Sequence, residues 1–192
     1  HRPGDLAFET TFVAAIKAVT EAVRFPVMVK LAATPDLVQQ AKVAEDLGAA
    51  SVTLCNRIRG LDVDVESGRP ILHGYFAGVG GPWAKYYIFK HVAEAYQEIH
   101  IPISATGGAI SGEDVLKYIM VGATTVQILS VIMVNGWGSI RTMNDHLVEF
   151  MKRKKIQNLN EIRGLAVRQM TPHEEIVRWS GEKKSGPRND WE

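Results

Sequence analysis

Residues 25–55, FPVMVKLAATPDLVQQAKVAEDLGAASVTLC, contain the pattern that decides the fold. The apolar run at 27–31 predicts a short strand buried on both faces. Thr34-Pro35 is typical of a helix start, and Gly48 is typical of a helix end, so a helix is predicted between them. A second apolar run, at 50–55, predicts another strand. This order indicates two parallel strands joined by a right-handed crossover through a helix.

The same unit recurs on either side of this stretch. The sequence predicts further strands over 101–105 and 124–129, helices over 6–24, 83–99, 112–121 and 137–153, a short helix near 158–170, and a small hairpin within 62–71. Each of the predicted strands precedes a helix, which indicates an α/β protein with a parallel sheet. The units fit either a small doubly wound sheet or half of an eight-stranded (β/α)8 TIM barrel, and spacing alone leaves both open.

The composition limits the class of protein. The 192 residues suffice for one domain, which we place at 1–170, followed by a polar C-terminal tail at 171–192. A net charge of +1 gives no bias towards nucleic acid or anionic membranes, and we expect neither as a partner. No apolar stretch reaches the length of a membrane span. The single cysteine excludes an internal disulfide and a four-thiolate iron–sulfur site, and it fits a cytoplasmic protein.

Lys30 lies near the C-terminal end of an otherwise apolar predicted strand. In a parallel barrel that end of the strand faces the active site. A buried ammonium group is costly unless it meets an anion or an electron-rich ring, so Lys30 is a candidate ligand-binding residue. An ion pair with a neighbouring carboxylate would explain the lysine equally well.

Asn56 and Arg57 follow the next predicted strand at the equivalent position. An asparagine offers donors and an acceptor to a planar heterocycle, and an arginine offers a rigid cationic fork. Both residues are also common in turns, which is the simpler interpretation of the pair.

Glycines cluster after the predicted strands and before helices, in GVGGP at 78–82 and TGG at 106–108, and Ser130 ends the last predicted strand. Glycines allow backbone amides to approach an anion, and loops after the last two strands of a barrel are a recurrent phosphate site. Tight turns also require glycine, so each cluster alone is weak. The histidines show no spacing typical of a metal site, and we expect no metal.

Several segments together resemble the dihydroorotate and dihydropyrimidine dehydrogenases, a family of FMN-binding TIM barrels. They are PVMVKL at 26–31, the strand-end Asn56, GVGGPWAK at 78–85, ATGG at 105–108, GED at 112–114 and GATTVQI at 122–128. Their order and spacing agree with the family along residues 25–134, and more weakly to about residue 164. The set is specific, although any one segment is not.

The resemblance implies that the chain is the C-terminal half of such a barrel, completed by another segment or chain. It implies an FMN-dependent oxidoreductase of pyrimidine metabolism that acts on a dihydroorotate-like or dihydropyrimidine-like ring. The FMN-binding residues that it implies are Lys30, the Cys55 backbone, Gly81, Gly107, Gly108 and Ser130. Lys30 would stabilise charge on the reduced flavin, and Asn56, with Arg57 beside it, would bind the substrate.

The sequence departs from the family pattern at three places. The family segment that carries the catalytic base would lie upstream of His1, so we assign no catalytic residue in this chain. Arg57 stands where the family usually has Ser or Thr, which adds positive charge beside the expected substrate. Leu129 stands where the family usually has Gly, close to the expected phosphate contact.

Three hypotheses for function follow. The first is a flavin oxidoreductase present as its cofactor-holding half, with a partner chain or segment supplying the first half of the barrel, and we expect an oligomer. The second is a non-catalytic half-barrel subunit of a larger complex. The third is a different phosphate-binding TIM-barrel enzyme, in which Lys30 would form a Schiff base with a small-molecule substrate.

Overall fold

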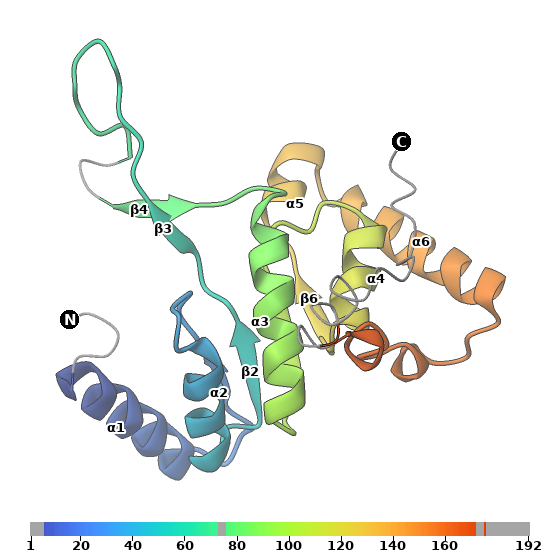
Figure 1. The fold of residues 1–192 in the computed structure, drawn as a ribbon, viewed down its shortest axis with the longest axis horizontal. Helices are drawn as coiled ribbons and strands as arrows, with labels where there is room; N and C mark the ends of the chain where they lie inside the picture. Colours follow the sequence, from blue (N-terminus) through green and yellow to red (C-terminus); the bar gives the residue numbers. More distant parts are fainter. Residues whose placement is uncertain (1–5, 73–75, 172–174, 176–192) are drawn as a thin grey trace.

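The computed structural model describes residues 6–72, 76–171 and 175 of this α/β protein (Figure 1). The strands are β1 (Met28–Lys30), β2 (Ser51–Leu54), β3 (Ile58–Gly60), β4 (Ala77–Val79), β5 (Ile103–Thr106) and β6 (Thr125–Gln127). The helices are α1 (Leu6–Ala22), α2 (Leu37–Asp46), α3 (Ala84–Glu98), α4 (Gly112–Met120), α5 (Ser130–Asn135) and α6 (Gly138–Lys154), followed by the 3-10 turns η1 (Leu159–Glu161) and η2 (Val167–Gln169). Most of the predicted C-terminal tail lies outside the described residues.

Four parallel strands form the main sheet in the order β1-β2-β5-β6. The predicted parallel α/β sheet is therefore confirmed. A doubly wound sheet reverses its strand order at a switch point. Here the four strands lie side by side in the order in which they occur in the chain, and this order does not reverse. The topology therefore favours the strand order of a barrel over that of a doubly wound sheet.

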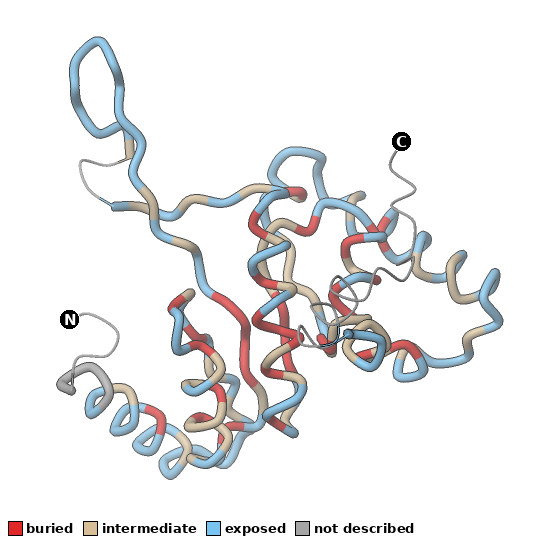
Figure 2. The backbone as a smooth tube through the Cα atoms, in the orientation of Figure 1, coloured by how far each residue is buried: buried red, intermediate tan, exposed pale blue. Residues whose placement is uncertain are grey.

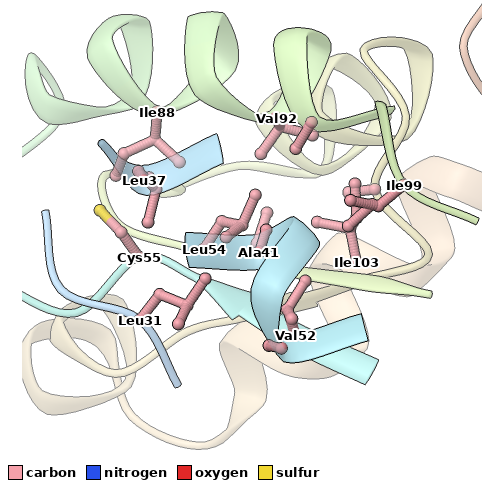
Figure 3. Close-up of a cluster of buried hydrophobic side chains, with 14 of the residues drawn as sticks. Leu31, Leu37, Ala41, Val52, Leu54, Cys55, Ile88, Val92, Ile99 and Ile103 are labelled. Atoms are coloured by element: carbon pink, nitrogen blue, oxygen red, sulfur yellow. The ribbon is translucent and has the colours of Figure 1, made fainter. Parts of the chain in front are cut away.

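One face of the sheet, the outer face, packs against α2 and α3 and forms the main core. Val52 and Leu54 of β2 are fully buried, and Ile103 of β5 is 2% exposed. Figure 3 shows these side chains meeting Leu37 and Ala41 of α2 and Ile88 and Val92 of α3. The alternation of the strands places every second side chain in this cluster, which is why the predicted apolar runs became strands at these positions.

The opposite face, the inner face, is not covered to the same extent. Met28 is 52% exposed, and Lys30 and Thr125 are also exposed. The prediction that residues 27–31 are buried on both faces is therefore wrong for β1 in this chain. The described helices that contact the sheet pack on its outer face, so only that side of β1 lies against a hydrophobic layer.

A hairpin projects from the sheet between β2 and α3 (Figures 1 and 2). Strands β3 and β4 pair antiparallel, with Arg59 opposite Gly78, and only an isolated bridge joins Val63 to Pro70 further out. The hairpin predicted within 62–71 is thus the exposed end of a longer ribbon. The prediction missed the paired base because β3 and β4 are short and rich in glycine, which weakens any strand signal.

The short helix predicted near 158–170 is instead the two 3-10 turns η1 and η2, and two residues predicted at element ends have other roles. Thr34 does not cap α2, whose N-cap is Asp36; its hydroxyl instead accepts a hydrogen bond from Gln40 at 3.2 Å. Ser130 begins α5 instead of ending β6, which stops at Gln127. None of the helices in the described part of the chain has both the length and the apolar character that crossing a bilayer requires.

Candidate functional site

The inner face of the sheet carries a row of polar side chains. The strand register places Lys30 beside Thr53, Thr53 beside Ser104, and Ser104 beside Thr125. Because neighbouring strands are parallel and in register, these four residues point to the same side. The row is the counterpart, on the other side of the sheet, of the apolar outer face.

Hydrogen bonds join most of this row. The Gln127 amide nitrogen donates to the Thr53 hydroxyl at 3.1 Å and to the Ser104 hydroxyl at 3.0 Å. The Thr125 hydroxyl donates to Ser104 at 2.9 Å. The Thr53 hydroxyl in turn lies 3.1 Å from the Met28 sulfur. The network fixes the floor of the inner face, and sequence reasoning missed it, because Thr53, Ser104 and Gln127 belong to three strands that are distant in the chain.

Lys30 is the C-terminal residue of β1, and its side chain is exposed on the inner face. No carboxylate among the described residues forms an ion pair with it, so the structure provides no support for the ion-pair interpretation within that part of the chain. The ammonium group stands beside an uncharged hydroxyl network. It is therefore available to an anionic or electron-rich ligand at the C-terminal ends of the strands.

The chain leaves β2 through Cys55 and Asn56. The peptide bond between Leu54 and Cys55 is cis, and the Cys55 side chain is buried in the apolar core. Burial raises the pKa of the Cys55 thiol to about 11, opposed in part by a backbone hydrogen bond and by the charge of Lys30. The thiol is thus protonated near neutral pH, and it is no candidate for an acid–base role there.

Asn56 and Arg57 lie at the same edge of the sheet. The Asn56 backbone amide donates to the Leu31 carbonyl at 2.7 Å, which ties the start of this segment to the end of β1, and the Asn56 side chain is exposed. The Arg57 stem lies instead over the hairpin, where a Cβ added at Gly78 would be 2.6 Å from Arg57 Cδ. The structure therefore ties Asn56 to the end of β1 through its backbone and places the Arg57 stem against the hairpin.

Two glycine segments meet at the ends of β5 and α3. A Cβ added at Gly108 would lie 2.8 Å from the Gly81 carbonyl oxygen and 2.7 Å from the Lys85 backbone nitrogen. Gly108 also has a φ of +70°, a conformation that favours glycine. Glycine at 108 is thus required by backbone contact. At Gly107, with φ +124°, an added Cβ would instead meet the Ile88 side chain of the core.

Backbone donors gather where β5 and β6 end. The amides of Gly107, Gly108 and Ser130 donate to no group among the described residues, and the same holds for Leu129. Amides free of internal partners at adjacent strand ends suit an anion with several oxygens. The Leu129 side chain, 69% exposed, is not packed in the core.

A buried ion pair, which sequence reasoning missed, connects the two glycine segments. Lys85 at the start of α3 donates to Asp114 of α4 at 2.5 Å, with side-chain exposures of 12% and 4%. Burial acts to raise the pKa of the Asp114 carboxyl, but hydrogen bonds from Lys85 and the Ile110 amide outweigh it and lower the pKa. Lys85 and Asp114 lie within the GVGGPWAK and GED segments that resemble the family, so the sequence singled out both residues. It did not indicate that they pair with each other.

Comparison with known proteins identifies the family of the chain. The family model described as dihydroorotate dehydrogenase matches residues 5–151. The chain belongs to the dihydroorotate dehydrogenase family. The resemblance of its motifs to that family is thus confirmed, and the match spans every strand of the sheet and both glycine segments.

Individual relatives give the extent of the similarity. The catalytic subunit of dihydroorotate dehydrogenase B (NAD(+)) from Methanocaldococcus jannaschii is 35% identical over 153 residues, which cover 78% of this chain and 49% of the relative. The corresponding subunit from Archaeoglobus fulgidus is 41% identical over 128 residues, or 67% of this chain and 42% of the relative. The chain spans about half the length of these curated relatives.

A solved structure agrees with these sequence matches. The crystal structure of DHODH in complex with ferulenol from Eimeria tenella, a TIM barrel, superposes with a TM-score of 0.61 at 26% identity. The superposition covers 74% of this chain and 39% of that chain. The parallel sheet described above therefore has the winding of a dihydroorotate dehydrogenase barrel.

Proposed function

We propose that this chain is the cofactor-holding half of an FMN-dependent oxidoreductase that acts on dihydroorotate or a similar dihydropyrimidine ring. The observation that carries the proposal is the set of amides at the ends of β5 and β6 that have no partner among the described residues. Lys30, at the end of β1 in the same sheet, is exposed and forms no ion pair with a described carboxylate. These donors fit a phosphate group, and a lysine without a carboxylate partner fits a ring that gains negative charge when it is reduced. Family membership supports the choice of a flavin.

Individual residues of the chain would bind the cofactor and the substrate. The amides of Gly107, Gly108 and Ser130 would hold the phosphate, with Gly81 in backbone contact with that loop. Lys30 would stabilise charge on the reduced ring system, and Asn56 would orient the substrate. FMN, when bound, would supply the hydride acceptor, while the protein would supply placement and electrostatics.

The proton-transfer step needs a group that the described inner face does not supply. Its side chains are hydroxyls, an amide, a thioether and the Lys30 ammonium, and the Cys55 thiol is buried and protonated. We therefore propose that a further segment or chain supplies both the base and the strands that cover the inner face. The sheet edges β1 and β6 are where it would pair, and Met28 and Leu129 are exposed there.

The assembly can be tested by its mass. Native mass spectrometry of the purified protein should detect a species larger than one 21.2 kDa chain, containing either a second polypeptide or a longer product. A monomer of 21.2 kDa that binds FMN and oxidises dihydroorotate would contradict the need for a covering half.

Flavin binding tests the cofactor assignment. The protein as purified, or after FMN is added, should be yellow and should show the visible absorbance bands of oxidised flavin.

Replacing Lys30 by Met should lower the flavin midpoint potential by on the order of 30 mV, which is about 1.4 kcal/mol for a two-electron couple. The matched control is Lys90→Met, because Lys90 is exposed on α3 and pairs with Glu94 of its own helix. An unchanged potential in Lys30→Met would remove Lys30 from the flavin site, and a protein that stays colourless would overturn the proposal.

A second candidate, a non-catalytic subunit of the same fold, is favoured by the lack of a general base on the described inner face. The two candidates differ in one measurement. Anaerobic addition of dihydroorotate to the flavin-loaded assembly should bleach the flavin absorbance in an enzyme and leave it unchanged in a non-catalytic subunit.

A further inference from the structure

The loop between β5 and α4, residues 107–111, is held in place from two sides. The Tyr118 hydroxyl donates to the Gly107 carbonyl at 2.5 Å, and the tyrosine is fully buried. Further along the loop, the Asp114 carboxylate accepts the Ile110 amide at 3.0 Å, and it is itself paired with Lys85. These side chains therefore set the path of the backbone between Gly107 and Ile110.

The hydroxyl of Tyr118 has a consequence for the next amide. The Gly107 carbonyl and the Gly108 N–H belong to one planar peptide unit, which is trans, so they point in opposite directions. Because Tyr118 draws the carbonyl towards the core, the Gly108 N–H must point away from it. That N–H is one of the donors without a partner among the described residues.

The ion pair fixes the same loop relative to α3. Asp114 binds the loop through Ile110 and binds Lys85, whose backbone nitrogen lies against Gly108. The pair is almost fully buried, which makes its geometry well defined and the loss of one partner costly. A second ion pair, Lys117–Glu113 at 2.6 Å, joins two residues of α4 itself and is exposed.

We infer that Tyr118 and the Lys85–Asp114 pair are positioning residues that aim the Gly108 amide at the phosphate group of the ligand. The inference rests on the proposed flavin site, and it assigns affinity for the phosphate end to side chains that do not touch the ligand. Their loss should weaken binding of a phosphorylated flavin without altering contacts to the ring.

A comparison of FMN with riboflavin tests this inference, because riboflavin has the same ring and no phosphate. Dissociation constants for both flavins are measured by fluorescence quenching in the full chain, in its native assembly. In Tyr118→Phe, FMN affinity should fall about fivefold, the effect of losing one orienting hydrogen bond. Riboflavin affinity should stay constant. The variant keeps the ring packing of Tyr118 on Phe89, whose centroids are 4.5 Å apart.

The matched control is Tyr96→Phe. The Tyr96 hydroxyl also donates to a backbone carbonyl, that of Arg163 at 3.4 Å, but on a different segment. This variant should leave both affinities unchanged. A Tyr118→Phe protein with the FMN-to-riboflavin preference of the wild type would overturn the inference, as would an equal loss of both flavins.

Asp114→Asn provides a second test with its own control. It keeps the shape of the side chain but removes the charge that Lys85 meets, and the FMN-to-riboflavin preference should again fall, by about tenfold. Glu113→Gln removes the exposed pair one residue earlier and should leave the preference unchanged. If Asp114→Asn does not fold, Tyr118→Phe decides the inference alone.

Failure of the inference and failure of the proposed function give different results. A wild-type protein that binds neither flavin, or binds both equally, contradicts the phosphate site and with it the proposed function. A wild type that prefers FMN, with Tyr118→Phe and Asp114→Asn retaining that preference, leaves the proposed function standing and refutes only the positioning role.

Discussion

The two faces of the four-stranded sheet differ in what their side chains do. The outer face is apolar and fully buried at Val52, Leu54 and Ala105. The inner face presents Lys30 and a hydroxyl–amide network and is partly open to water. Alternation along each strand separates these two sets residue by residue. Folding free energy therefore comes mainly from one face, while the chemistry can lie on the other.

The largest effect is expected on the outer face. Replacing Leu54 by Ala should lower the free energy of unfolding by about 2–5 kcal/mol, because a fully buried leucine leaves both lost contacts and a cavity. Urea unfolding followed by circular dichroism measures it. The control Leu61→Ala, at a residue 51% exposed on the hairpin, should change stability by less than about 0.5 kcal/mol. Equal losses in the two variants would refute the assignment of the core to the outer face.

An intermediate effect is expected at Cys55, where the outer core reaches the end of β2. Burial raises the pKa of its thiol from 9.0 to about 11. Below pH 9 the thiol is protonated in both states, and stability is unaffected. Between pH 9 and 11 the unfolded state ionises first, so stability falls as pH rises, by about 1–2 kcal/mol at pH 10.5.

The comparison with Cys55→Ala isolates this loss. The variant lacks the thiol but keeps Tyr118 and every other group that titrates in the same range. Urea unfolding at pH 8 and pH 10.5 should show a larger drop for the wild type than for the variant. Parallel drops, or a thiol that reacts with a thiol reagent at pH 8 as fast as free cysteine, would show that Cys55 is not buried.

The sequence predicts the outer face better than the inner face, and the reason is physical. Apolar periodicity located the four parallel strands, because β2, β5 and β6 each bury residues against a helix next to them in the chain. The prediction that β1 is covered on both sides was wrong, because Met28 and Val29 are equally apolar and periodicity cannot tell which face is open. The pairing of Lys85 with Asp114 required the relative placement of α3 and α4, which local pattern does not contain.

The smallest effect is expected on the inner face itself. Gln127→Leu removes the two hydrogen bonds to Thr53 and Ser104. Thr53 and Ser104 are buried, but the Ser104 hydroxyl keeps its hydrogen bond from Thr125 and the Thr53 hydroxyl keeps Met28 as a partner. Urea unfolding should therefore show a loss of only about 0.5–1 kcal/mol in the free energy of unfolding. Gln97→Leu, which removes one hydrogen bond to Ala93 on the surface of α3, is the control and should have a smaller effect. A loss as large as that of Leu54→Ala would contradict the assignment of most of the folding free energy to the outer face.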